Sequence, residues 1–119
     1  MTDNRPIVIF ETKPFTRNFD KLVGKAERLE LYCHLESGPK SGDVIPGSGG
    51  IRKLRWSRPG MGKRGGVRII YYFFDARGLV SLLTIYAKSD KEDLSKQEIK
   101  AFRNVVEQIK SEIDGGENE

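Results

Sequence analysis

The chain has 119 residues, of which 37% are hydrophobic and 32% are charged, with one cysteine and a formal net charge of +4. This length predicts one domain over residues 1–119, with residues from about 115 to 119 frayed. The lone Cys33 excludes an internal disulfide and a multi-cysteine metal site, and the start of the chain lacks the apolar run of a secretory signal. No segment has the apolar length of a membrane span, so we expect a cytoplasmic protein with no membrane partner.

The first third of the chain predicts a strand followed by two helices. Residues 7–11 are mostly β-branched or aromatic, which indicates a strand. Thr12 can cap a helix with Pro14 in its first turn. The expected buried face of this helix comprises Phe15, Phe19, Leu22 and Val23. A second helix is expected from Lys25 to Glu36, with Ala26, Leu29, Tyr32 and Cys33 on one side.

The middle of the chain predicts three consecutive strands after a loop rich in Gly, Ser and Pro. The first runs over residues 51–57 with alternating faces, the second over residues 67–74 and the third over residues 79–87. A tight turn at residues 75–78 joins the last two, so the three form an antiparallel meander. Ser95 and Glu98 match a capping box, and the helix that follows carries an apolar stripe and ends at residues 114–117.

The resulting order is β-α-α-β-β-β-α. It predicts an α+β fold with a small antiparallel-rich sheet, two N-terminal helices and a C-terminal helix, with the helices on one face of the sheet.

Positive charge is concentrated in the strands of this meander. Between Val44 and Phe74 there are seven basic residues and no acid. The seven are Arg52, Lys53, Arg55, Arg58, Lys63, Arg64 and Arg68. Outside them, the remaining 14 basic residues are outnumbered by the 17 acidic ones. Cations fixed on strands form a surface that can bind a polyanion.

Several catalytic motifs are missing from this region. The glycines at residues 47–50 precede a strand and lack the Lys-Ser/Thr pair of a phosphate loop. The acid-free span argues against a two-metal nuclease, and we expect no metal or cofactor. The one histidine, His34, lies on a predicted helix and cannot act as both acid and base, so we interpret it as a helix-surface or partly packed side chain.

The cluster favours binding of phosphate and of RNA bases. Arginine recognises phosphate through two parallel hydrogen bonds, and Tyr72 and Tyr86 could stack a base. Arg52, Arg58, Lys63, Arg64 and Tyr72 are the RNA-binding candidates. The alternative is that these cations face solvent or pair with the acidic C-terminal region.

The same residues could cleave RNA through its own 2′-hydroxyl, which requires a base, an acid and cations for the phosphorane charge. Lysines among arginines are feasible bases, and Lys53 and Lys88 are the candidates. Arg55 and Arg68 are candidates for charge stabilisation.

Three segments together resemble the HigB branch of the RelE/ParE superfamily of bacterial toxins. They are GSGGIRKLRW, GKRGGVRIIYYFF and LLTIYAKSDKEDLS, and the similarity extends from about Ile7 to Ile113. The resemblance implies a RelE-like fold and the toxin of a type II toxin–antitoxin pair. It also implies an endoribonuclease (an mRNA interferase) that cuts messenger RNA without metal in the A site of the 70S ribosome, beside the 16S rRNA, and so stops translation.

The implied partner is a cognate HigA-type helix-turn-helix antitoxin, and operator DNA is bound only through that antitoxin. Carried over by residue, Arg68 matches the arginine at the scissile phosphate, and Lys53 with Arg55 match the preceding basic strand. Lys88 matches the basic position after the last strand. Where RelE has a late catalytic tyrosine this chain has Leu94-Ser95, so Tyr86, Tyr72 or a lysine can take that role.

Two other functions fit the same fold. One is a non-nuclease toxin that binds gyrase, as ParE members do, because fold alone does not separate the two. The other is a non-catalytic RNA-binding domain, whose binding would fall steeply with salt.

Overall fold

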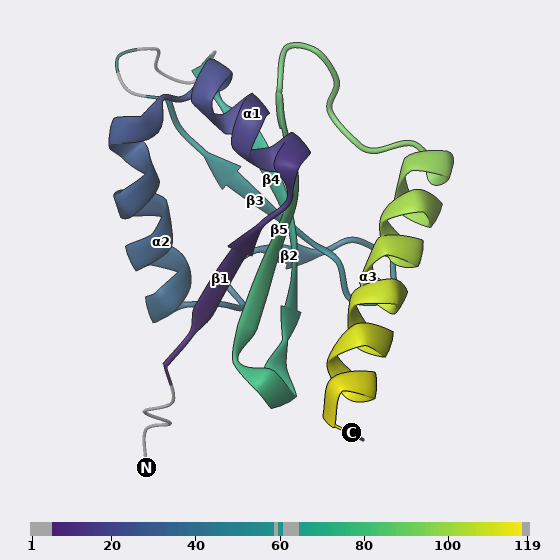
Figure 1. Ribbon diagram of the computed structural model, residues 1–119. Coiled ribbons are helices and arrows are strands. Elements are labelled where there is room, and N and C mark those ends of the chain that lie inside the picture. The colour runs from purple at the N-terminus through teal and green to yellow at the C-terminus, as the bar shows by residue number, and fades with distance from the viewer. Residues whose placement is uncertain (1–5, 59, 61–64, 118–119) are drawn as a thin grey trace.

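The computed structural model describes residues 6–58, 60 and 65–117, and its elements are labelled in Figure 1. In chain order they are β1 (Val8–Glu11), α1 (Lys13–Leu22), α2 (Arg28–Ser37), β2 (Asp43–Val44), β3 (Arg52–Trp56), β4 (Val67–Phe74), β5 (Leu79–Ala87) and α3 (Lys96–Glu117). The expected order of elements is confirmed, with the two-residue strand β2 added. Helix α3 runs to Glu117, at the far limit of the expected end at residues 114–117, because the glycines there cost only about 1 kcal/mol each.

The five strands form one sheet in the order β1-β5-β4-β3-β2. Strands β3, β4 and β5 pair antiparallel in sequence, as the meander predicts. Strand β1 pairs parallel with β5, so the sheet is mixed. The turn between β4 and β5 places Gly78 at φ 63°, the left-handed conformation for which glycine is suited.

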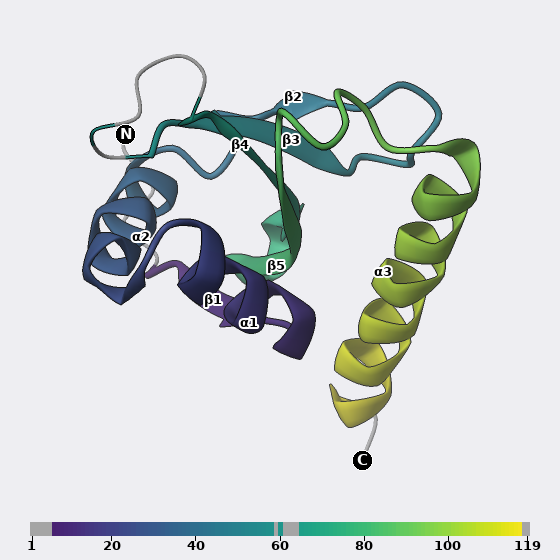
Figure 2. The same ribbon diagram turned by 90° about the horizontal axis from the view of Figure 1, so that it is seen from above.

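The helices cover both faces of the sheet, so the expectation that they share one face was wrong. Figure 2 shows α1 and α2 on one side and α3 on the other. Alternate residues of β4 enter two separate cores, which explains why both faces need cover. The α1–α2 core comprises Phe15, Phe19, Leu31, Leu35, Leu54, Val67, Ile69, Tyr71, Val80, Leu82 and Ile85. The α3 core comprises Ile51, Ile70, Phe74, Leu83, Tyr86 and Val106.

Helix α2 buries a different side from the one the sequence predicted. Leu31 and Leu35 are fully buried, whereas Leu29 is 73% exposed and Cys33 is exposed. Residues 25–27 form a tighter 3₁₀ turn, and the α-helix begins only at Arg28. The different twist of that turn changes which residues face the sheet.

An ion-pair network ties β1, α1 and α2 together. Arg28 Nε donates to Glu11 Oε2 at 2.7 Å and Arg28 Nη1 donates to Asp20 Oδ1 at 2.9 Å. The hydroxyls of Tyr32 and Thr16 also donate to the Glu11 carboxylate. Burial is the largest single influence and raises the pKa of Glu11, but the hydrogen bonds from Arg28, Tyr32 and Thr16 together hold that pKa below its ordinary value.

The sequence signals at the helix starts are confirmed. The Thr12 side chain accepts a hydrogen bond from the Phe15 N–H at 3.3 Å at the start of α1. At the start of α3, the Ser95 Oγ accepts from the Glu98 N–H at 3.1 Å and Glu98 Oε1 accepts from the Ser95 N–H at 2.9 Å, which is a reciprocal capping box. This cap fixes where the loop of residues 88–95 ends.

Candidate functional site

A row of polar side chains crosses the three meander strands on the α3 face of the sheet. Arg55 of β3 lies opposite Arg68 of β4, and Arg68 lies opposite Tyr86 of β5. Like charges that face each other across neighbouring strands destabilise the pairing. Two facing arginines therefore form a position at which an anion would be stabilising.

Arg68 is buried, and its donors are poorly satisfied. The residue is 5% exposed, and its Nη2 lies 3.4 Å from Glu92 Oε1 while its Nη1 donates to the Val67 carbonyl at 3.4 Å. The buried Nε has no hydrogen-bond partner among the described residues. A buried donor without a partner carries a cost of about 1–3 kcal/mol, which a bound anion could remove.

A cavity of about 350 Å³ opens at this row. Its described lining residues are Arg55, Trp56, Ser57, Gly66, Arg68, Lys88 and Glu92. The Lys88 N–H donates to the Gly66 carbonyl at 3.0 Å, which extends the β4–β5 pairing by one step and holds the exposed Lys88 side chain at the cavity. The cavity is therefore lined by three cationic side chains and one carboxylate.

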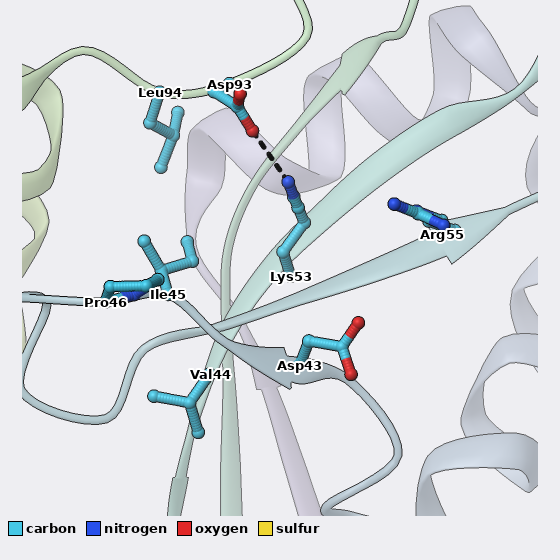
Figure 3. Close-up of a pocket in the computed structure, with 8 residues that line it drawn as sticks. All are labelled: Asp43, Val44, Ile45, Pro46, Lys53, Arg55, Asp93 and Leu94. Carbon is cyan, nitrogen blue, oxygen red and sulfur yellow. Dashed lines mark hydrogen bonds and ion pairs between the residues drawn. The ribbon is translucent and has the colours of Figure 1, made fainter.

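A second cavity of about 380 Å³ adjoins the first, because Arg55 lines both. Figure 3 shows Lys53 of β3 directed at Asp93, and its Nζ lies 2.7 Å from Asp93 Oδ1. The hydrogen bond and the charge of Lys53 hold the pKa of Asp93 below its ordinary value. In the same view Arg55 lies apart from this pair, farther along β3.

Tyr86 is the residue that β5 contributes to the row. The residue is 7% exposed, and its hydroxyl donates to the Glu92 carbonyl at 3.4 Å. Burial and, to a smaller degree, the charge of Asp93 raise the pKa of Tyr86 to about 12, against the opposing effect of Arg68. At neutral pH the phenol is therefore protonated, and it can donate a proton or hydrogen bond but not accept a proton.

The residues predicted to be catalytic lie at neighbouring positions. Arg55, Arg68 and Lys88 line the first cavity, Lys53 lines the adjoining one, and Tyr86 lies opposite Arg68 in the sheet. The predicted RNA-binding residues are dispersed. Arg52 lies on the opposite face of β3, where its Nη1 donates to the Gly42 carbonyl at 2.7 Å and to the Lys40 carbonyl at 3.1 Å.

Tyr72 lies four residues from Arg68 along β4, roughly 13 Å at the usual rise of a strand. It packs against Phe74, and Lys110 of α3 lies 5.0 Å from its ring centroid.

Arg58 bonds the Gly65 carbonyl through its Nε and lines a third cavity with Arg55 and Trp56. Lys63 and Arg64 lie outside the described residues. His34 is exposed on α2, with its Nε2 3.1 Å from Ser41 Oγ.

Two acids at the site were not singled out from the sequence. Glu92 and Asp93 lie in the loop between β5 and α3, and they pair with Arg68 and Lys53. The alternative that cations pair with acids of the C-terminal region therefore holds for these two. The available signal was the run DKED, which follows Lys88 closely and has charges opposite to the basic strands.

Among the described residues, no group of at least three His, Cys, Asp or Glu side chains is placed to hold a metal ion. None of the helices in the described part of the chain is long and apolar enough to cross a membrane.

The fold and the site define a small α+β protein with a row of cationic side chains across its sheet. The model of the family described as RelE toxin of the RelE/RelB toxin-antitoxin system matches residues 7–114, so the chain belongs to the RelE toxin family.

Solved structures of E. coli proteins share the fold. A mutant of E. coli toxin RelE in the free state has a TM-score of 0.54 at 14% identity, over 74% of this chain and 90% of that chain. The isolated E. coli RelE toxin has a TM-score of 0.52 at 14% identity, over 83% of this chain and 98% of that chain. A chain of the intact E. coli RelBE toxin–antitoxin complex has a TM-score of 0.52 at 14% identity, over 68% of this chain and 95% of that chain.

Proposed function

We propose that this chain is the toxin of a type II toxin–antitoxin pair, of the HigB branch, and that it cleaves messenger RNA in the ribosomal A site. The observation that carries the proposal is the pair of facing arginines, one of them buried with an Nε that has no partner among the described residues. A buried guanidinium with an unsatisfied donor destabilises the fold, and it is well placed to bind a phosphate that gains negative charge during a reaction. Membership of the RelE family supports the choice of an RNA backbone as the source of that phosphate.

The reaction is attack of a ribose 2′-hydroxyl on the adjacent phosphate. Arg68 and Arg55 bind the non-bridging oxygens and stabilise the phosphorane. The Lys88 ammonium is a donor at the cavity, and the protonated Tyr86 hydroxyl lies next to it, opposite Arg68 in the sheet. Lys53 is paired with Asp93 in the adjoining cavity, so we assign it no direct part in the reaction.

The size of the site supports dependence on the ribosome. Each of the two adjoining cavities measures a few hundred cubic ångströms, at about 350 and 380 Å³. That volume accommodates a phosphate and its sugar, not a length of RNA. We therefore expect the A site to hold the message in place, which provides the orientation that cleavage requires.

The partner we propose is a HigA-type helix-turn-helix antitoxin that binds operator DNA, with the toxin attached to it. The neighbouring RelBE structure is a toxin–antitoxin complex, which supports an antitoxin partner of some kind. The site of action is the cytoplasm, where translating ribosomes are found.

The test is mapping of messenger RNA 5′-ends after brief induction without antitoxin, for the unmodified chain, Arg68→Ala and Arg52→Ala. Cuts inside translated frames should vanish with Arg68→Ala and remain with Arg52→Ala, which loses the same charge on the opposite face. Growth arrest with uncut messages would replace this function by a gyrase-binding toxin. RNA binding without cleavage or arrest would leave a non-catalytic RNA-binding domain.

A further inference from the structure

Cleavage through the 2′-hydroxyl needs a group that takes the hydroxyl proton, and the geometry of the first cavity identifies one. This inference rests on the proposed ribonuclease function and assigns a further residue within it. Tyr86 holds its own proton because its pKa is raised to about 12. A lysine side chain is an ammonium ion at neutral pH and must lose a proton before it can accept one. Glu92 is the one carboxylate among the described residues that line the cavity.

The position of Glu92 matches what a base requires. Its Oε1 lies 3.4 Å from Nη2 of Arg68, the donor proposed to bind the phosphate. The 2′-hydroxyl and the scissile phosphate are attached to neighbouring ribose carbons. A carboxylate in contact with the guanidinium that holds the phosphate is therefore within reach of that hydroxyl.

The backbone around Glu92 is held in place, although its side chain is 57% exposed. The N–H groups of Asp90 and Lys91 donate to the Ala87 carbonyl at 3.0 and 3.4 Å, which forms a turn directly after β5. The Glu92 carbonyl accepts the Tyr86 hydroxyl at 3.4 Å. Lys91 is paired with Glu98 of the α3 cap. The backbone at Glu92 is thus held in place, while its exposed carboxylate can leave Arg68 and contact a substrate hydroxyl.

We propose that Glu92 is the general base of the cleavage reaction. Its carboxylate takes the proton of the 2′-hydroxyl as the 2′-oxygen bonds to phosphorus. The bond between phosphorus and the 5′-oxygen breaks, and that oxygen takes a proton from the Lys88 ammonium. The products are a 2′,3′-cyclic phosphate and a free 5′-hydroxyl. Exchange with water returns a proton to Lys88 and removes one from Glu92, so the cycle is balanced.

The charged groups facing Glu92 come from three strands and its own loop. Arg68 of β4, Arg55 of β3 and Lys88 after β5 share its cavity. The Tyr86 hydroxyl contacts its carbonyl, and Asp93 is the adjacent acid, paired with Lys53. The three cations keep the cavity positive, so a single carboxylate does not prevent phosphate binding.

The experiment is single-turnover cleavage of messenger RNA bound to 70S ribosomes by the full chain. Glu92→Gln should slow the cleavage step by roughly 10²- to 10⁴-fold, the usual range for a lost general base. Asp90→Asn is the matched control, because it removes the same charge from the same loop but lines neither cavity described here. It should retain the wild-type rate, and Arg68→Ala should abolish cleavage.

Two further readouts separate a base from a residue that only positions Arg68. Glu92→Asp keeps a carboxylate at this position and should recover part of the rate that Glu92→Gln loses. In a substrate whose bridging 5′-oxygen is replaced by sulfur, the leaving group needs no proton. That substrate should restore the rate of Lys88→Ala but not the rate of Glu92→Gln.

These measurements distinguish failure of the proposed nuclease function from failure of the role of Glu92. If the wild type cuts, Arg68→Ala does not, and Glu92→Gln cuts at the wild-type rate or faster, the nuclease stands and the role of Glu92 is refuted. A Glu92→Asp that cuts no faster than Glu92→Gln, or a slower Glu92→Gln that recovers on the sulfur substrate, also refutes it. If the wild type leaves ribosome-bound messages whole, the proposed function fails and the role of Glu92 fails with it.

Discussion

Replacement of Arg68 by methionine should make the protein more stable while it removes the activity. The residue is 5% exposed, its Nε has no hydrogen-bond partner among the described residues, and Arg55 lies directly opposite. An unsatisfied buried donor costs about 1–3 kcal/mol, and a facing like charge costs about 0.5 kcal/mol. Methionine has a similar length and no charge, so we expect a gain of about 2 kcal/mol in the free energy of unfolding.

Chemical and thermal denaturation would measure this gain. For a chain of this size, about 2 kcal/mol corresponds to a rise in Tm of roughly 6–10 °C. Arg55→Met is the control, because it removes the same facing charge from an exposed position and should change stability by at most about 0.5 kcal/mol. If Arg68→Met is instead less stable than the unmodified chain, the guanidinium is a structural member of the sheet and is not retained for a ligand.

Two other predictions concern the fold. The pKa of Glu11 is lowered in the folded protein, so its interaction with Arg28 stabilises the fold above the ordinary carboxylate pKa and is lost as pH falls through the lowered value. Glu11→Gln should cost about 2 kcal/mol at pH 7 and progressively less in acid, and an equal loss at every pH in urea titrations would contradict this. Ser95→Ala should cost about 1 kcal/mol by removing the cap of α3, whereas Ser95→Asp should retain most of the stability. Equal stability of the two variants would show that the cap does not contribute.

The sequence was sufficient to predict the strands and the faces of the basic residues. Side chains alternate along a strand, so the position of Arg68 relative to Ile69 and Ile70 follows from spacing alone, and the structure confirms it. The same alternation predicted that Lys53 and Arg55 share a face. The strong pattern came from β-branched and aromatic residues, whose preference for strands is local.

The features that were left open or mispredicted depend on packing between distant segments. Neither the sequence of β1 nor that of β5 indicates that the two strands pair in parallel. The buried side of α2 depends on where a 3₁₀ turn gives way to the helix, and a shift of one residue rotates every side chain by about 100°.

The position of Glu92 at the site could not be predicted from the sequence. Its position comes from a turn in a loop, and loops have no periodicity from which a direction can be calculated. Likewise Tyr72 shares a face with Arg68, but the length of β4 keeps it apart from the cavity.

The arrangement of the meander has a consequence for the order of folding. Strands β3, β4 and β5 pair with one another in sequence order, so the strand contacts that build the charged row close short loops. The contacts that attach β1 and α1 close long ones, since the Thr12 hydroxyl reaches the Leu83 carbonyl across 71 residues. Short loops close first. The charged row should therefore take shape before the N-terminal segment completes the sheet, and variants that weaken the docking of β1 should raise the unfolding rate far more than they slow folding.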